Sequence, residues 1–212
     1  MEHLPIFPLN LAVLPGEPVP LHIFEPRYQK LLADVAPVPP AEDYAPFGIQ
    51  YSRKQQLNEI GCAVVVHDLL HRYPDGRLDI LAYGTRRYRL LNTQSSGPED
   101  YLKGTITWLE DEEPEENVSD ALNAEVLKQY KRFLSMLDKD DSTLELPVKT
   151  TQLSFTVAYR INLELAPRLE LLDTRSEVER LELLLTYLEH AIPKLQKTRE
   201  FRRRVRSNGY FA

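Results

Sequence analysis

The chain has 212 residues, and its content of 42% hydrophobic and 27% charged residues is ordinary for a soluble globular protein with an apolar core. The net charge of -6 repels nucleic acid and anionic membranes on average, and no run approaches the roughly 18 apolar residues that a membrane span needs. Cys62 is the single cysteine, which excludes an intrachain disulfide. Residues 1–5 lack the basic region and apolar run of a signal peptide, so we expect a cytoplasmic protein.

The first half of the sequence predicts short strands separated by turns. Prolines at both ends of residues 5–9 suit an edge strand or a strand that leads into the sheet. Gly16 permits a turn before a strand at 19–24, and Pro26 suits the first position of a helix that Pro37 ends. Further strands are predicted at 47–52, 61–73, 78–83, 85–91 and 101–109, with a hairpin turn at 74–77 and a bend or bulge at Gly84. Six or seven such strands favour a closed or nearly closed barrel.

After Pro114 the hydrophobic period becomes helical. Residues 174–177 have the capping-box pattern, in which a hydroxyl and a carboxylate satisfy amides of the first turn, and they begin a last helix whose apolar seam runs to Leu195. Pro193 is expected to kink that helix or to end its regular part. The other predicted helices are 122–137, capped by Asn117 or Ser119, then 153–161 and 167–172.

These patterns predict an α+β fold with a β-rich subdomain at 1–113 and a helical subdomain at 114–212. The acidic stretch at 110–116 is interpreted as a solvated hinge between the two. No pair of acidic residues is isolated among apolar neighbours, so we expect the carboxylates to be solvated.

No catalytic, cofactor or metal motif is found in the sequence. The glycines include no pair at the spacing of a phosphate loop and no G-x-G, which argues against ATP hydrolysis and a dinucleotide site. On a strand, Cys62 faces away from His67 and His71, which separates a thiol from its base. The two histidines lie four residues apart, roughly 13 Å along an extended chain, which is too far for one zinc ion. We therefore predict a buried, inert Cys62, no metal and no cofactor.

Basic residues gather in two places, and each has two interpretations. On a strand at 85–91, Arg86, Tyr88 and Leu90 face one way, while Arg87 and Arg89 face the other. These arginines can pair with local carboxylates, which we favour, or bind a carboxylate, a phosphate or a nucleic-acid backbone. The basic residues at 194–206 favour a solvated helix end over contact with nucleic acid.

Several segments of the sequence resemble the amino-terminal domain family of Lon proteases. Leu4-Pro5-Ile6-Phe7-Pro8-Leu9, Val13-Leu14-Pro15-Gly16 and Pro20-Leu21-His22-Ile23-Phe24-Glu25-Pro26-Arg27-Tyr28 are similar to the start of that domain. Residues 61–63, 74–78 and 84–89 match its hairpin and its strand of glycine, basic and aromatic residues. The match is closest to small bacterial proteins that consist of this domain alone.

The resemblance implies a PUA-like β pseudo-barrel followed by an α-helical subdomain, and a role in recognising polypeptides. No position in this sequence matches the ATPase motif or the Ser–Lys pair of full Lon proteases, so we expect no enzymatic activity. Among the motif residues, Phe7 and Phe24 are expected to pack the barrel and Tyr28 to anchor the first helix to the sheet. The candidate binding positions are Arg27, Tyr28, Arg86, Arg87 and Tyr88.

The leading hypothesis is a non-catalytic module that holds exposed apolar segments of a protein partner and assists Lon-type proteolysis. The alternative is a PUA-like protein that binds RNA or a small ligand, and a third hypothesis is an enzyme whose polar groups converge across strands. Neither a membrane nor DNA is expected as a partner.

Overall fold

The computed structural model describes residues 2–37, 43–95, 97, 100–112, 118–137 and 152–208, with side chains as far as Phe201. Contacts between Cα atoms divide the chain into a first unit, Met1–Glu110 with Glu164–Asp173, and a second unit, Asp111–Leu163 with Thr174–Ala212. The sequence predicts Glu164–Asp173 to be part of the helical subdomain, whereas these residues belong to the first unit. The predicted boundary at 113/114 falls within 113–117, outside the described residues, and stays a prediction.

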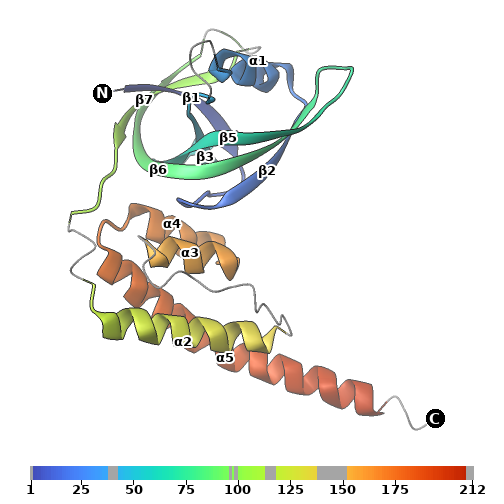
Figure 1. The fold of residues 1–212 in the computed structure, drawn as a ribbon, viewed down its shortest axis with the longest axis vertical. Coiled ribbons are helices and arrows are strands. Elements are labelled where there is room, and N and C mark those ends of the chain that lie inside the picture. The colour runs from blue at the N-terminus through green and yellow to red at the C-terminus, as the bar shows by residue number, and fades with distance from the viewer. Residues whose placement is uncertain are drawn as a thin grey trace. The chain divides into compact units, whose positions relative to one another are not determined.

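The first unit is a small β-barrel (Figure 1). The strand order is β1-β7-β6-β5-β3, and parallel pairing of β1 with β3 closes the ring, as predicted from the number of short strands. The strand β2 pairs with β6 outside this ring, and β4 pairs with β3. The elements of this unit are β1 (Glu2–Leu9), β2 (Pro18–Ile23), α1 (Pro26–Val35), β3 (Phe47–Arg53), β4 (Gln56–Leu57), β5 (Ile60–Arg72), β6 (Leu78–Gln94), β7 (Leu102–Trp108) and α4 (Leu165–Asp173).

The strand β1 is not an edge strand, which corrects one of the two predicted possibilities. Its residues 2–6 pair with β7 and its residues 6–9 pair with β3, so it closes the barrel by changing partner at Ile6. Each half of the strand has a partner on one side only. Pro5 and Pro8 are tolerated because each half has one side on which no donor is required.

The hairpin of β5 and β6 forms as predicted around Gly76, which has φ 92°. The two strands predicted at 78–83 and 85–91 are one continuous strand, β6, with the bulge in its pairing with β5 between Gly84 and Arg87. Gly84 is required because the Leu14 carbonyl lies where a Cβ would be. The turn between β3 and β4, in which Lys54 and Gln55 have positive φ, was not predicted.

The core of the barrel confirms the prediction for Tyr28 and contradicts the one for Phe24. The ring of Tyr28 stacks on Phe7 with centroids 3.9 Å apart, which anchors α1 to the sheet. Phe24 is 60% exposed, so its predicted role in packing the barrel is wrong. In β2 the buried residues alternate as Val19, Leu21 and Ile23, and the residue after Ile23 therefore points outward.

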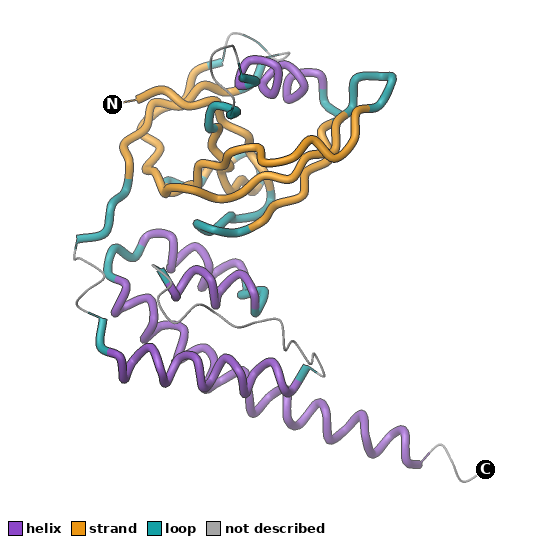
Figure 2. Tube along the Cα trace, in the orientation of Figure 1, coloured by secondary structure: helices purple, strands orange, loops and turns teal. Residues whose placement is uncertain are grey.

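The second unit consists of helices α2 (Asp120–Met136), α3 (Leu153–Arg160) and α5 (Glu177–Asn208), shown in purple in Figure 2. Ser119 is the cap of α2, since its hydroxyl accepts a hydrogen bond from the Leu122 amide at 3.2 Å. The helix α5 continues through Pro193, so the prediction that its regular part ends there is wrong, whereas the kink stays a prediction. The strands of the first unit and the helices of both units together confirm the predicted α+β class.

The predicted capping box at 174–177 is also wrong. A cap at Thr174 would start the helix at Arg175, but the helix begins two residues later, at Glu177, and the Ser176 hydroxyl accepts from the Glu179 amide at 3.4 Å. The Glu177 carboxylate turns instead to Ser154, accepting from its amide at 2.8 Å and from its hydroxyl at 2.6 Å. A carboxylate with these two donors and a nearby cation is held more firmly than one that caps its own helix.

That cation is Arg180, whose side chain is fully buried. Its guanidinium donates to both oxygens of Asp111, at 2.8 and 2.5 Å, and to Glu177 at 2.7 Å. Its charge also lies over the ring of Phe155, 4.6 Å from the centroid. Asp111 belongs to the acidic stretch that was interpreted as solvated, so this interpretation is wrong for Asp111; residues 113–116 lie outside the described residues.

Candidate functional site

Four rings form a contiguous group on the first unit, which we call the ring cluster: the exposed His22, Phe24 and His71 and the partly buried Tyr73. The ring centroids lie 6.0 Å apart for His22 and Phe24, 5.9 Å for His22 and Tyr73, and 4.3 Å for His71 and Tyr73. The register explains the grouping, because Asp79 of β6 lies opposite His22 of β2 and opposite His71 of β5. The cluster therefore gathers residues 22–24 and 71–73 on the end of a three-stranded sheet.

Asp79 fixes the orientation of this cluster. Its carboxylate contacts Nδ1 of His22 at 2.5 Å and accepts from the Tyr73 hydroxyl at 2.8 Å. These hydrogen bonds lower the pKa of Asp79, and the bond to the carboxylate raises the pKa of Tyr73. With two rings held by one carboxylate, the cluster presents a partly ordered surface of aromatic and imidazole rings to solvent.

The outer part of β5 is an edge beside the ring cluster. Pairing of β5 with β3 involves only Cys62, Ala63 and Val64, and no strand within the described residues pairs with this side of residues 65–72. The edge of β2 differs, because Pro18 and Pro20 have no amide to offer a further strand. An extended segment can thus find backbone partners on β5, next to His71.

Arg27 and Tyr28, two of the predicted site residues, line one groove of about 500 Å³. The Arg27 guanidinium pairs with Glu25 at 2.6 Å and lies 4.7 Å from the centroid of the Tyr28 ring. Burial raises the pKa of Tyr28, and burial together with a hydrogen bond to Asp34 raises the pKa of Tyr101 to about 12. The rest of the groove is mixed, with polar residues at Ser52, Gln55, Thr93, Ser95 and Asp100 and apolar ones at Pro8, Leu57 and Leu102.

The structure separates the other three predicted residues, Arg86, Arg87 and Tyr88, from that groove. Arg86 is exposed, pairs with Glu110 and lies 4.2 Å from the ring centroid of Trp108. Arg87 is buried and donates to the Leu172 carbonyl of α4 at 2.7 Å. Tyr88 is fully buried over Gly48 and Gly61, where no Cβ would fit beneath its ring. The arginine contacts support the structural interpretation of this strand.

Arg89 shares the face of Arg87, as the alternation of the strand predicted. Its guanidinium contacts Glu59 at 2.7 Å and Asp173 at 3.1 Å. A further arginine that sequence reasoning did not single out, Arg168, is buried and pairs with Glu17 at 2.7 Å. These contacts join α4 to the barrel, and no sequence pattern linked such distant residues.

Cys62 is buried, as predicted, and burial raises the pKa of its thiol to about 12. His67 and His71 are exposed, with Nδ1 of His67 2.8 Å from Asp68. In the part of the chain that the structure describes, no group of three or more His, Cys, Asp or Glu side chains is placed to hold a metal ion. None of its helices is both long and apolar enough to cross a membrane.

The first unit is thus a closed small barrel that carries exposed rings and an open strand edge. The chain belongs to the family of ATP-dependent protease La (LON) substrate-binding domains, whose model matches residues 3–190. This confirms the resemblance found in the first three segments of the sequence.

Relatives and solved structures agree with that membership. The chain is 28% identical to a Lon protease of Brevibacillus choshinensis over 72% of this chain and 20% of that one, and 24% identical to a Lon protease of Azospirillum brasilense over 95% and 26%. It thus spans about a fifth to a quarter of the length of these relatives.

Two solved structures share the fold. A Lon N-terminal domain protein from Xanthomonas campestris has a TM-score of 0.63 and 24% identity, with 88% of this chain and 99% of that one covered. The N-terminal domain of the Mycobacterium avium complex Lon protease has a TM-score of 0.61 and 21% identity, with 89% and 98% covered. At these identities the likeness establishes the fold alone.

Proposed function

We propose that this protein is a non-catalytic module of the cytoplasm that binds polypeptide segments with exposed apolar side chains, and that the ring cluster is its contact surface. The observation that carries the proposal is the exposed Phe24, which extends a chain of touching rings instead of filling the barrel core. Exposed rings of this kind gain free energy when an apolar side chain covers them.

Family membership and the strand edge support this function. The family is described by its substrate-binding role in the LON protease, which acts on polypeptides, and the edge of β5 offers the backbone hydrogen bonds that an extended chain needs. Backbone pairing on β5 would hold a segment without regard to its sequence. The adjacent rings would then favour segments that carry apolar residues.

The proposal is tested by measuring binding of reduced, carboxymethylated α-lactalbumin, which stays unfolded, by fluorescence anisotropy. Phe24→Ser should weaken binding about tenfold or more, since covering one aromatic ring contributes roughly 1.5–3 kcal/mol. Because Phe24 is 60% exposed, the fold should be unaffected, and circular dichroism checks this.

Phe201→Ser is the matched control. Phe201 is 67% exposed and lies on α5 of the second unit, so the substitution removes an equally exposed ring from another place. Equal affinity of wild type and Phe24→Ser, or equal losses in the two variants, would refute the ring cluster as the contact surface.

Association with Lon-type proteolysis is part of the proposal. Degradation of the same unfolded polypeptide by a Lon protease should change when this protein is added, and Phe24→Ser should reduce the change. The purified protein by itself should leave the polypeptide intact. Cleavage by the protein alone would contradict the non-catalytic assignment.

RNA binding is the alternative function. The arginines that suggested it contact Glu110, Leu172, Glu59 and Asp173 within the fold. If RNA binds, its affinity should fall steeply with salt through counterion release.

A further inference from the structure

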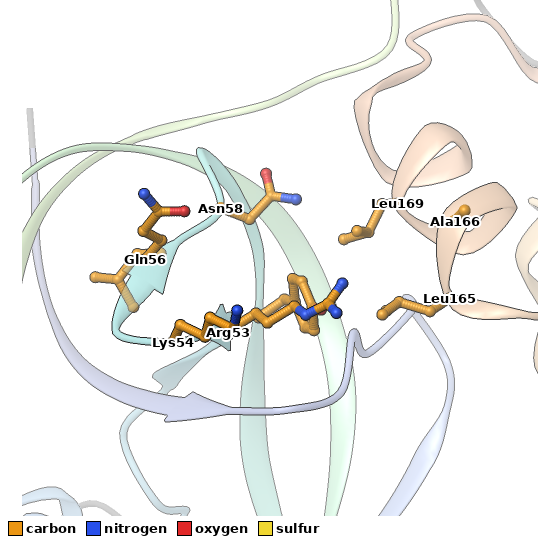
Figure 3. A pocket seen from close by; sticks show the side chains of 9 residues that line it. Arg53, Lys54, Gln56, Asn58, Leu165, Ala166 and Leu169 are labelled. Atoms are coloured by element: carbon orange, nitrogen blue, oxygen red, sulfur yellow. The ribbon is translucent and has the colours of Figure 1, made fainter.

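A second groove of the first unit, of about 610 Å³, lies between the β3–β4 hairpin and α4 (Figure 3). It contains none of the residues of the ring cluster and none of the predicted site residues. Its volume is within the range of about 300–1,000 Å³ that is usual for ligand sites. The lining residues are Tyr51, Arg53, Lys54, Gln56, Leu57, Asn58, Leu165, Ala166 and Leu169.

The two walls of this groove differ in chemistry. The α4 wall is apolar and consists of Leu165, Ala166 and Leu169, with Leu165 36% exposed at the start of the helix. The hairpin wall carries two cationic side chains, those of Arg53 and Lys54, and Figure 3 shows the Arg53 side chain extending toward α4. A ligand that fits must therefore present an apolar side to one wall and a negative charge to the other.

Arg53 and Lys54 have no acidic partner within the described residues. Neither Arg53 nor Lys54 forms an ion pair there, and no carboxylate is among the residues that line the groove. Most other arginines of this unit pair with an acidic residue, as Arg86, Arg89 and Arg168 do. Two adjacent unpaired cations in a protein with a net charge of -6 form a local positive site.

The turn that presents the cations is strained. Lys54 has φ 50° and Gln55 has φ 65°, whereas a two-residue hairpin with these angles is most stable as Asn-Gly. The sequence thus places a lysine and a glutamine where other residues would stabilise the hairpin more. Strain of this kind concentrates at binding sites, and here it coincides with the unpaired charges.

We propose that this groove binds a short extended polypeptide segment in which apolar and acidic residues alternate. Successive side chains of an extended chain point to opposite sides, so leucine-like residues would face α4 while glutamate or aspartate side chains face Arg53 and Lys54. The site is separate from the ring cluster, and it adds a preference for acidic residues that the rings do not provide.

The probe is a fluorescein-labelled eight-residue peptide of alternating leucine and glutamate, acetylated and amidated so that it has no terminal charges. Binding should weaken as salt rises, because two exposed cations contribute. A peptide with glutamine in place of glutamate should bind about tenfold more weakly, the scale of one or two charge-assisted hydrogen bonds. Equal affinity of the two peptides would overturn the proposal.

Variants of the chain test each wall. Arg53→Gln should weaken binding of the glutamate peptide about tenfold and leave the glutamine peptide unchanged. Leu165→Ser should weaken both peptides, whereas Leu137→Ser, which alters a residue of similar exposure at 38% in the second unit, should weaken neither. Unchanged affinity in Arg53→Gln, or equal effects of Leu165→Ser and Leu137→Ser, would overturn the proposal.

The turn itself provides a readout that a purely structural role would not give. The double variant Lys54→Asn and Gln55→Gly relieves the positive-φ strain, so it should melt at a higher temperature while binding the glutamate peptide more weakly. Lys131→Gln, on α2 of the second unit, controls for the loss of one positive charge. If the double variant is more stable and binds the glutamate peptide as well as wild type does, Lys54 does not contribute to binding.

Two further measurements distinguish a polypeptide from other occupants of the groove, and binding in the groove from binding at the ring cluster. Decanoate carries a carboxylate and an apolar chain without a peptide backbone; if it displaces the peptide at equal concentration, the occupant is a small carboxylate and not a polypeptide. The difference in affinity between the glutamate and glutamine peptides should be the same in Phe24→Ser as in wild type, because it depends on the groove and not on the rings. Loss of unfolded-polypeptide binding in Phe24→Ser and of peptide binding in Arg53→Gln are therefore independent results.

Discussion

The interior of the barrel holds polar groups that stay uncharged, such as the Cys62 thiol and the Tyr88 hydroxyl, whereas the helical unit encloses the Arg180 guanidinium between Asp111 and Glu177. The barrel is closed by backbone hydrogen bonds between strands, which leave its surface side chains free for other uses. The helical unit depends on side chains to join α3, α5 and the segment around Asp111. The comparison teaches that pairing of strands closes the barrel, whereas a buried group of charges joins the parts of the helical unit.

The largest effect is expected from breaking the buried charge cluster. Arg180→Ala leaves Asp111 and Glu177 without their cation and should reduce the free energy of unfolding by about 3–5 kcal/mol. Urea denaturation followed by circular dichroism measures it. Arg175→Ala, which removes an exposed pair with Glu112, is the control and should cost less than about 1 kcal/mol. Similar losses in the two variants would show that the helical unit does not depend on buried charge.

A smaller effect is expected from overfilling the barrel. Gly84→Ala places a methyl group against the Leu14 carbonyl and should reduce the free energy of unfolding by about 1–3 kcal/mol. Gly97→Ala is the control, since nothing lies within 4 Å of a Cβ at that position. Equal melting temperatures of wild type and Gly84→Ala would contradict the close approach of the two backbone segments.

Because the Cys62 thiol is buried, the free energy of unfolding should depend on pH in the alkaline range. Burial raises the pKa of Cys62 from 9.0 to about 12, so in the unfolded chain the thiol ionises first. The stability contributed by the neutral thiol is complete below pH 9 and is lost as the pH rises toward 12, by about 1.4 kcal/mol for the first pH unit. Unfolding curves at pH 8 and 10 for wild type and Cys62→Ala measure the difference. Parallel pH profiles would show that the thiol is accessible to solvent.

The smallest effect is expected on the arginine strand. Arg86→Gln removes a solvent-exposed pair with Glu110, so the free energy of unfolding should change by less than about 1 kcal/mol. Differential scanning calorimetry of the two proteins checks this. If Arg86→Gln reduces the free energy of unfolding as much as Arg180→Ala does, exposed and buried arginines do not differ in their contribution to stability.

Much of the fold could be predicted because its signals are local. The turn at 74–77, the start of α1 at Pro26 and the helical spacing of α2 follow from residues close together in the sequence. The candidate site was less predictable. Arg27 and Tyr28 line a groove, but Phe24 was assigned to the core because an aromatic residue in an apolar segment is usually buried.

The sequence by itself determined the family, the number and order of most strands and helices, and the burial of Cys62 and Tyr28, because hydrophobic period, prolines and glycines act over a few residues. Only the tertiary structure decided that β1 closes the barrel, that Arg180 is buried against Asp111 and that Arg53 and Lys54 face an apolar helix. The physical reason is that the partner of a charge or a strand edge is chosen by packing between residues far apart in the sequence, 151 positions in the case of Glu17 and Arg168, which no local pattern records.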